Sequence, residues 1–250
     1  MVSGMKSKSN MKTLGVILGR AGSVGLPGKH LLPLLGKPVI EYTFDHAMAA
    51  RRLDCLVVST DCAGVKRLAE QRGLRVIDRP AHLATSDASV QDVMLHAMET
   101  IEQDGDFAAE ALIVLYGNVP VRGAGVIDRA LELLESSGCD SVRTFCPVGK
   151  WHPAWMSRLE GDVVHALQPG NIHRRQDLTP LYLHDGAVVA ISRKSMLRGR
   201  EFPVDPHAFF GVDRRGIQTG AGETVEIDHR RDLYWAEAVL QDQSAAQEAA

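Results

Sequence analysis

The segment that most constrains the fold is Leu14–His30, LGVILGRAGSVGLPGKH, in which an apolar run leads directly into a glycine-rich loop. The run Leu14–Leu18 is short and uninterrupted, which is typical of a strand buried on both faces of a sheet. The loop contains evenly spaced glycines and two cations, at Gly19, Gly22, Gly25, Gly28, Arg20 and Lys29. Glycines let backbone amides approach a ligand closely, and the cations attract an anion. We therefore expect a strand followed by a polyphosphate-binding loop, the alternative being a flexible turn.

Two well-known phosphate-binding loops do not match this segment. The pattern G-x-x-x-x-G-K-[ST], aligned on Gly28 and Lys29, needs a glycine where Ser23 stands and a Ser or Thr where His30 stands. The dinucleotide fingerprint G-x-G-x-x-G needs two glycines two residues apart, and no pair in the loop has that spacing. The segment therefore argues against both a P-loop ATPase and a nicotinamide dehydrogenase.

Strand-like and helix-like segments alternate along the first part of the chain. Further strands are expected over Cys55–Ser59, Arg75–Asp78, Ala111–Tyr116 and Ser141–Pro147. Helices are expected over Val39–Ala50, Ala63–Arg72, Val90–Glu102 and Val126–Ser136. This alternation predicts an α/β fold, a mostly parallel Rossmann-like sheet with helices on both faces. Because ligands bind at the carboxyl ends of such strands, the loop 19–30, Asp61 and the segment Tyr116–Arg122 are expected to share one cleft.

The second half of the chain has a different character. Residues 151–179 are punctuated by Pro and Gly, and we expect an irregular segment flanked by two short strands. The remaining elements are two strands and an amphipathic helix, expected over Ala187–Ser192, Glu223–Ile227 and Arg231–Leu240. We therefore expect a disordered leader, one domain with an inserted lobe, and a flexible tail, at 1–11, 12–241 with about 140–183 inserted, and 242–250.

Composition excludes several classes of protein. The net charge of −3 argues against sequence-independent nucleic-acid binding, which depends on an excess of Lys and Arg. The four cysteines form no C-x-x-C pair, so we expect reduced thiols rather than a disulfide scaffold or a zinc site. No apolar run resembles a signal-peptide core or a membrane span. We expect a cytoplasmic protein without nucleic-acid or membrane partners.

Six segments, taken together and in order, carry a resemblance to a known family. They are GRAGSVGLPGKH (19–30), VVSTD (57–61), RPAHLATSDAS (79–89), RRQDLTP (174–180), HDGAVVAI (184–191) and VEIDHRRDLYWAE (225–237). The chain resembles the CMP-sialic acid and CMP-Kdo synthetases, which are cytidylyltransferases with a nucleotidyltransferase fold. The resemblance implies transfer of CMP from CTP to the anomeric hydroxyl of a sialic-acid-like or other 3-deoxy-ulosonic acid, with release of pyrophosphate.

The resemblance assigns the nucleotide site to the glycine loop and to the segment 79–89. Arg20 and Lys29 match the loop cations that hold the triphosphate, and they are the expected catalytic residues, because phosphoryl transfer depends on positioning and charge stabilisation. The other expected nucleotide contacts are Gly19, Gly22, Ser23, Gly25, His30, Arg79, Ala88 and Ser89. Arg79 and the backbone near Ala88 would meet cytosine. Alternatively, the cations extend into solvent, and the segment 79–89 caps the following helix.

Glu226 and Asp228 match the pair of aspartates with which the family binds metal. In a strand, with its period of two, both carboxylates lie on one face while Ile227 points the other way. A Mg²⁺ ion offsets the repulsion between two close anions and binds phosphate oxygens. The resemblance therefore implies Mg²⁺ as cofactor, the alternative being that Asp228 caps the helix that follows.

The expected contacts to the sugar acid come from two separate segments, at Tyr116, Asn118, Arg174, Arg175 and Gln176. The adjacent arginines offer a bidentate fork to the substrate carboxylate, or alternatively form a solvated basic edge. The family commonly forms dimers through the inserted lobe, so we expect a homodimer. Trp151 and Trp155 suit that interface or, alternatively, the lobe's own core.

Besides Glu226, which stands where the family has an aspartate, three positions or segments depart from the family pattern, all in the expected cleft. Val24 stands where a second lysine is usual, and His30 replaces a common asparagine. The segment LYGNVPVR (115–122) stands where the family reads L-Q-P-T-S-P-L-R, so Tyr116 replaces a glutamine and Asn118 a threonine. Tyr116 either contacts substrate or packs at the strand end. Two alternatives therefore stay open: a nucleotide-binding homologue with a regulatory role, and a nucleotidyltransferase with another nucleotide or acceptor.

Overall fold

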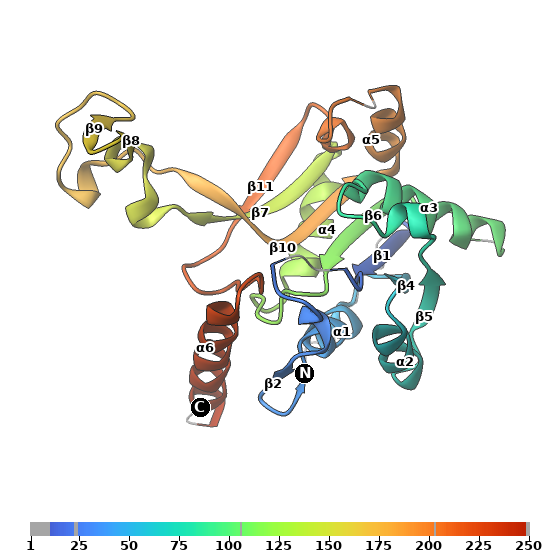
Figure 1. Ribbon diagram of the computed structural model, residues 1–250. Coiled ribbons are helices and arrows are strands. Elements are labelled where there is room, and N and C mark those ends of the chain that lie inside the picture. The colour runs from blue at the N-terminus through green and yellow to red at the C-terminus, as the bar shows by residue number, and fades with distance from the viewer. Residues whose placement is uncertain (1–10, 23–24, 106, 203, 249–250) are drawn as a thin grey trace, which may run out of the picture.

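A computed structural model describes residues 11–22, 25–105, 107–202 and 204–248 (Figure 1). Its centre is a seven-stranded sheet with the order β11-β7-β10-β6-β1-β4-β5. These strands are β1 (Thr13–Leu18), β4 (Cys55–Thr60), β5 (Arg75–Asp78), β6 (Ala111–Tyr116), β7 (Ser141–Pro147), β10 (Tyr182–Ser192) and β11 (Arg214–Gln218). Strand β10 is antiparallel to both of its neighbours, and the other pairs are parallel. The predicted α/β fold with a mostly parallel sheet is confirmed.

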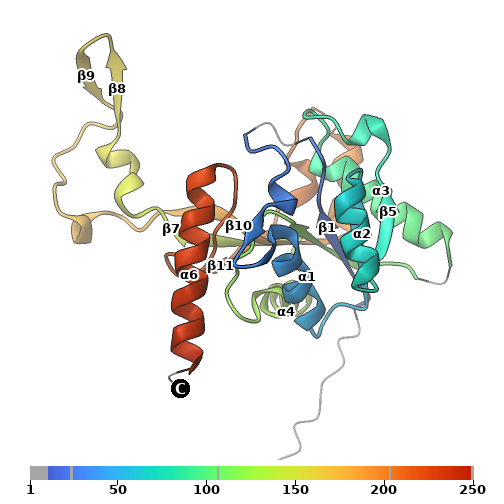
Figure 2. The ribbon, with the colours of Figure 1, turned by 60° about the horizontal axis from the view of Figure 1, so that its bottom comes forward.

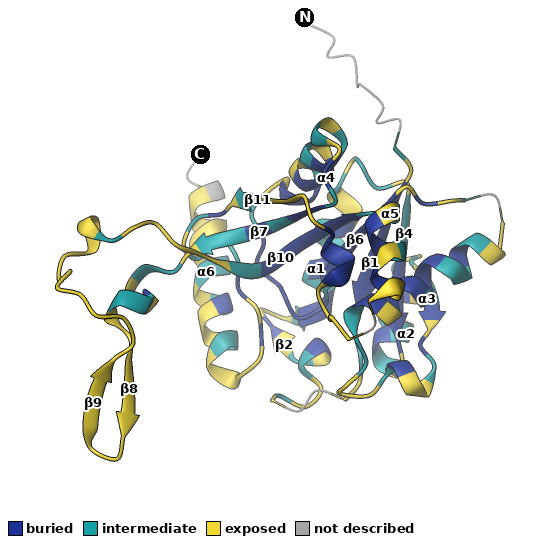
Figure 3. Ribbon diagram, turned by 90° about the horizontal axis from the view of Figure 1, so that it is seen from above, coloured by how far each residue is buried: buried dark blue, intermediate teal, exposed yellow. Residues whose placement is uncertain are grey.

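Helices cover both faces of the sheet. One face packs against α3 (Val90–Gln103) and α5 (Arg193–Arg198), and the other against α1 (Val39–Ala49), α2 (Ala63–Gln71) and α4 (Val126–Ser137). In β1, Val16 packs in the core cluster that contains α3, and Ile17 packs in the cluster that contains α1. Alternate residues of a strand face opposite sides, so a strand buried on both sides is apolar throughout. Figure 3 shows the resulting buried centre.

The elements predicted up to Pro147 agree with the structure to within one residue at each end. The second half differs in two strands. Residues Glu223–Ile227 form no strand, because their β-type pairing is limited to one isolated bridge, between Val121 and Val225, that lies outside the strands. The sheet edge is instead β11, which was not predicted because its sequence RRGIQ is mostly exposed and has no apolar alternation.

A lobe made of residues 148–181 stands away from the sheet at the end of the β7–β10 ribbon (Figures 1 and 3). It contains a hairpin of β8 (Ser157–Glu160) and β9 (Val163–Ala166), whose residues are all exposed. The two short strands expected to flank residues 151–179 therefore lie inside that range and pair with each other. Strand β10 also begins five residues before the predicted Ala187, because it carries the chain back from the lobe.

The C-terminal helix α6 (Arg230–Glu248) lies between the lobe and α1 (Figure 2). A small core cluster attaches it to the hairpin of β2 (Pro33–Leu34) and β3 (Lys37–Pro38). The predicted end at Leu240 is wrong, and most of the tail expected over 242–250 is helical, because Ala, Gln and Glu favour helix without an apolar pattern. Among the described residues, no helix has the length and apolarity needed to cross a bilayer.

Candidate active site

A cavity of about 370 Å³ lies at the carboxyl ends of β1 and β6. The structure brings together there many of the residues predicted for the site, which are Arg20, Gly25, Lys29, His30, Arg79, Ala88, Tyr116, Asn118, Glu226 and Asp228. The expected sharing of one cleft by the glycine loop and the start of the segment 116–122 therefore holds. Asp61 does not line the cavity, but its carboxylate accepts a hydrogen bond from Ala21 N at 2.8 Å and so fastens the loop.

Several predicted residues lie elsewhere. Gly19 and Gly22 do not line the cavity, and Ser23 lies outside the described residues, as does Val24. Ser89 does not line it either, because its hydroxyl caps α3 by accepting from Asp92 N at 3.0 Å. Ser89 therefore has the role given by the alternative prediction, in which this segment caps the following helix.

The two loop cations are held by partners rather than extended into solvent. Lys29 Nζ lies 2.7 Å from Asp228 Oδ1, and the lysine side chain is only 15% exposed. Arg20 Nη1 donates to Thr85 O at 2.6 Å, across the cavity from its own loop. Gly25 allows this packing, because a Cβ there would lie 2.9 Å from Asp228 O. The cavity therefore concentrates fixed positive charge, which suits a polyphosphate.

Two further basic residues on the wall are buried. His30 is 5% exposed, and its burial together with the Lys29 cation lowers its pKa from 6.5 to about 4, so the ring is neutral at pH 7. Arg79 is 8% exposed, and its burial lowers its pKa to about 10, so it stays charged. Arg79 Nε and Nη2 donate to the hydroxyl and carbonyl of Ser59 at 3.2 and 2.8 Å, which fixes the guanidinium plane against the cavity.

The predicted metal pair reaches the cavity without a strand. Asn118 Nδ2 lies 3.1 Å from Glu226 Oε1 and 3.4 Å from Asp228 Oδ1, so one amide contacts both carboxylates. Partial loss of hydration and the neighbouring Asp228 raise the pKa of Glu226, although the residue keeps part of its surface exposed to solvent. At the start of α6, it is Asp232 that accepts from the amides of Asp228 and His229, at 2.9 and 2.7 Å. The carboxylate of Asp228 is thus directed to the cavity rather than used as the predicted cap.

Tyr116 combines the two roles that the sequence left open. Its ring packs against the core cluster containing α3, and it also lines the cavity. Burial and the nearby Glu226 raise the pKa of its hydroxyl to about 12, so the group is protonated at pH 7. A neutral hydroxyl on the wall can donate a hydrogen bond to a ligand.

Arg122 is a residue that sequence reasoning did not single out. It is 4% exposed, and it donates to Ala187 O at 2.9 Å and to Tyr116 O at 2.7 Å. Its burial lowers its pKa to about 9. Arg122 therefore fixes the end of β6 that presents Tyr116 and Asn118. The sequence feature that could have indicated Arg122 is its position at the end of the segment 116–122, which was expected to reach the cleft.

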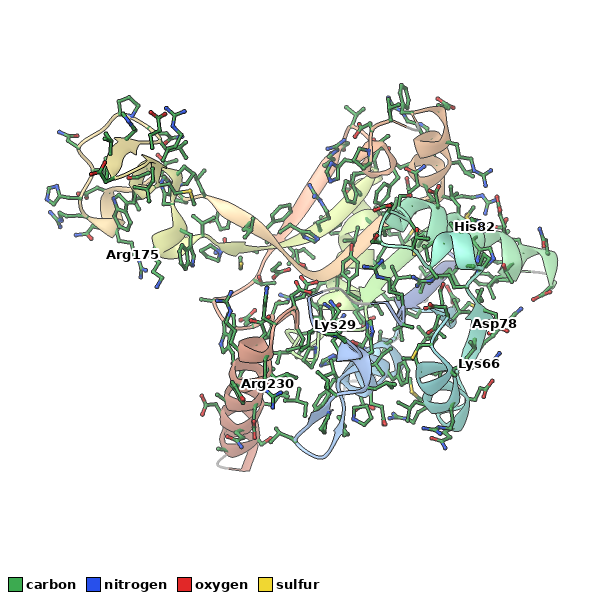
Figure 4. The ribbon with its side chains drawn as sticks, in the orientation of Figure 1. Lys29, Lys66, Asp78, His82, Arg175 and Arg230 are labelled. Atoms are coloured by element: carbon green, nitrogen blue, oxygen red, sulfur yellow. The ribbon has the colours of Figure 1, made fainter. Side chains whose placement is uncertain are left out.

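The structure does not bring Arg174, Arg175 and Gln176 to the cavity of their own chain. All three are exposed on the lobe, and Figure 4 shows Arg175 far from Lys29. The β7–β10 ribbon carries the lobe outward from the sheet, which is the physical reason for this separation. Within one chain, these residues are part of a different surface.

Comparisons with known proteins agree with the fold. A family model described as cytidylyltransferase matches residues 14–238. An N-acylneuraminate cytidylyltransferase of Streptococcus agalactiae serotype V is 33% identical over 89% of this chain and 52% of its own length. A CMP-N,N'-diacetyllegionaminic acid synthase of Legionella pneumophila is 28% identical over 92% of this chain and 97% of its own.

A solved structure shares the fold along almost the whole chain. The CMP:2-keto-3-deoxy-manno-octonic acid synthetase complexed with CTP superposes with a TM-score of 0.70 at 20% identity, covering 93% of this chain and 99% of its own. The present chain spans about half the length of the streptococcal relative. The similarity therefore covers the cavity and the sheet, and it leaves the other half of that relative unmatched.

Proposed function

The chain belongs to the cytidylyltransferase family, and from this premise we propose that it transfers CMP from CTP to a sialic-acid-like or other 3-deoxy-ulosonic acid. The observation that carries the proposal is the cavity, in which the cations of the glycine loop face a pair of carboxylates. The names of the relatives support the acceptor class, since they refer to N-acylneuraminate and diacetyllegionaminic acid.

In the proposed reaction the anomeric oxygen of the sugar acid forms a bond to the α-phosphorus of CTP. The bond from that phosphorus to the bridging oxygen of the β-phosphate breaks, the hydroxyl proton passes to water, and pyrophosphate leaves. Negative charge grows on the phosphoryl and pyrophosphate oxygens, so the fixed cations Arg20 and Lys29 are the residues that stabilise it. We assign Arg79 and the backbone near Ala88 to cytosine. Both line the cavity, and the hydrogen bond to Ser59 holds the Arg79 guanidinium in a fixed orientation, as recognition of a base requires.

Glu226 and Asp228 fit a Mg²⁺ ion shared with the nucleotide. Both are hard oxygen donors on one cavity wall, and Mg²⁺ is commonly held by one or two carboxylates together with phosphate oxygens and water. No cluster of three or more His, Cys, Asp or Glu residues suited to a metal occurs in the described parts of the chain. When bound, Mg²⁺ would supply charge stabilisation at the phosphate oxygens.

We further propose that the protein acts as a homodimer through its lobe. The lobe leaves large apolar side chains uncovered, with Trp151 68%, Leu159 67%, Val164 64% and Leu167 55% exposed. Leu159 and Val164 are cross-strand neighbours in the β8–β9 hairpin, and exposed apolar side chains that lie together are typical of an interface. Arg174, Arg175 and Gln176 would then bind the acceptor carboxylate in the partner's cavity, since they lie far from their own. The four free cysteines support a cytoplasmic location.

The test is a screen for pyrophosphate release. Purified protein with Mg²⁺ is incubated with each of the four nucleoside triphosphates and a panel of sugar acids that includes nonulosonic acids and Kdo. We expect release with CTP and with one class of 3-deoxy-ulosonic acid. Release with another nucleotide would identify a different nucleotidyltransferase. Binding of CTP without release from any pair would replace the proposal by a regulatory, nucleotide-binding function.

A further inference from the structure

Asn118 connects the segment after β6 to the segment that carries both carboxylates. Its side chain is 5% exposed, and Nδ2 lies 3.0 Å from Ile227 O in addition to its contacts with Glu226 and Asp228. Ile227 N in turn donates to Asn118 O at 2.7 Å. A strand would place Glu226 and Asp228 on the same face. Here the hydrogen bonds of Asn118, rather than strand pairing, hold the two residues on the same side. The positions of Glu226 and Asp228 therefore depend on Asn118.

The contacts of Asn118 use only one oxygen of each carboxylate. Oε1 of Glu226 accepts from Asn118, and Oδ1 of Asp228 accepts from Asn118 and Lys29. Among the hydrogen bonds of the described residues, none is made to Glu226 Oε2 or Asp228 Oδ2. Each carboxylate therefore keeps one oxygen free for a cation.

The other side of Glu226 is shaped by the backbone of β10. Gly186 has a φ of +76°, and a Cβ there would lie 3.1 Å from Glu226 Oε2. The carboxylate of the preceding Asp185 accepts from Thr224 Oγ1 at 3.0 Å, which ties the same segment to β10. Glu226 thus accepts from an amide donor on one side, and on the other side Gly186, which has no Cβ, leaves room for its side chain.

We propose that Asn118 is a positioning residue for the divalent cation, holding Glu226 and Asp228 so that Oε2 and Oδ2 are free to bind it. This inference rests on the proposed function. A carboxamide suits the task because its two N–H groups are shared between the Ile227 carbonyl and the two carboxylates, and they add no charge. A lysine at this position would compete with the cation, and an aspartate would add a third anion.

Asn118 and Glu226 are 108 residues apart in the sequence and in direct contact. Both are departures from the family pattern, which has threonine and aspartate there. An aspartate is one methylene shorter and would not reach the amide from the same backbone position. A threonine hydroxyl offers one donor instead of two. The two departures are therefore coupled, and exchange of one alone should disturb the carboxylate pair.

The experiment measures metal binding rather than turnover. Mn²⁺ is titrated into protein saturated with CTP, without sugar acid, and free Mn²⁺ is followed by electron paramagnetic resonance. Asn118→Thr and Glu226→Asp should each weaken Mn²⁺ binding by about tenfold, the lower end of the loss seen when residues that orient metal ligands are changed. The double variant should recover most of that affinity. CTP binding in EDTA should be unchanged in all three.

Asn171→Thr, the same change at an exposed lobe position, is the control and should bind Mn²⁺ like the wild type. Thermal unfolding shows whether each variant folds, and Asn118→Ser replaces Asn118→Thr if that variant does not. Wild-type affinity in the Asn118 variant, or additive losses in the double variant, would overturn the positioning role. Failure of the wild type to bind CTP would instead overturn the proposed function.

Discussion

The cavity and the lobe both present cations, but their surroundings differ. In the cavity, Lys29 is 15% exposed and pairs with Asp228, which is 199 residues away in the sequence. In the lobe, Arg174 is 59% exposed and pairs with Asp177, three residues along the chain. An ion pair between distant segments exists only because the fold assembles it, and here the lysine is shielded while Asp228 is 52% exposed. An exposed local pair contributes little on its own. The comparison supports the proposal that one chain assembles the cavity and that the lobe cations act on a second copy of the chain.

The largest expected effect comes from the cavity. Lys29→Ala should lower kcat for pyrophosphate release by about 10²–10³-fold, the usual loss when one charge-stabilising donor is removed from a reaction centre. Lys37→Ala is the matched control, because Lys37 pairs with Asp45 outside the cavity and should keep wild-type rates. Initial rates at saturating CTP and acceptor give the answer. A rate near that of the wild type for Lys29→Ala would contradict the proposal that the reaction takes place in this cavity.

The second effect concerns the pH dependence of stability. The pKa of His30 is lowered to about 4 in the folded protein, against 6.5 for a free histidine. Below pH 6.5 the unfolded ring binds a proton that the folded ring does not, so this stabilisation is complete above pH 6.5 and is lost as pH falls toward 4. For this one group, we expect the free energy of unfolding to fall by about 2 kcal/mol between pH 7 and pH 5.

Urea unfolding of His30→Asn at these two pH values isolates this contribution. The variant should lose about 2 kcal/mol less than the wild type on acidification. His46, whose pKa burial also lowers to about 4, contributes equally to both proteins. His173→Asn, at an exposed lobe position, should behave like the wild type. An unchanged pH dependence in His30→Asn would show that the ring is not held neutral.

The third experiment tests whether the arginines of the lobe act in the cavity of their own chain or in that of the partner. Lys29→Ala has an intact lobe and a defective cavity, and a variant with Arg174→Ala and Arg175→Ala has the reverse. If the lobe acts on its partner, a re-equilibrated equal mixture should regain about a quarter of wild-type activity, since half of the dimers contain one intact site. Absence of recovery, or a monomer by light scattering at all concentrations, would contradict the arrangement.

The sequence predicts the cavity well and the lobe poorly, for a physical reason. The strands and helices up to Pro147 follow apolar periodicity, and the topology of a parallel sheet then brings the loop 19–30 and Tyr116 to one edge. Glu226 and Asp228 both line the cavity, but the sequence argument put them on one face of a strand, and no strand forms there. No local pattern shows that Asn118, rather than a strand, holds them.

The lobe could not be predicted from apolar patterns because its strands β8 and β9 are exposed on both sides. Its direction depends on the β7–β10 ribbon, which extends beyond the sheet. In the sequence, the adjacent arginines at 174 and 175 therefore look the same whether they bind a ligand in their own chain's cavity or in that of a partner. Only their distance from the cavity separates the two interpretations.

The smallest expected effect compares two tyrosines, one in each region. Tyr116→Phe removes a hydroxyl on the cavity wall, and Tyr182→Phe removes one that is 45% exposed at the base of the lobe. If Tyr116 donates to the sugar acid, its loss costs a single hydrogen bond, and KM for the acceptor should rise by about fivefold while KM for CTP stays unchanged. Tyr182→Phe should leave both values as they are. An effect of Tyr116→Phe on CTP alone would move this residue from the acceptor side of the cavity to the nucleotide side.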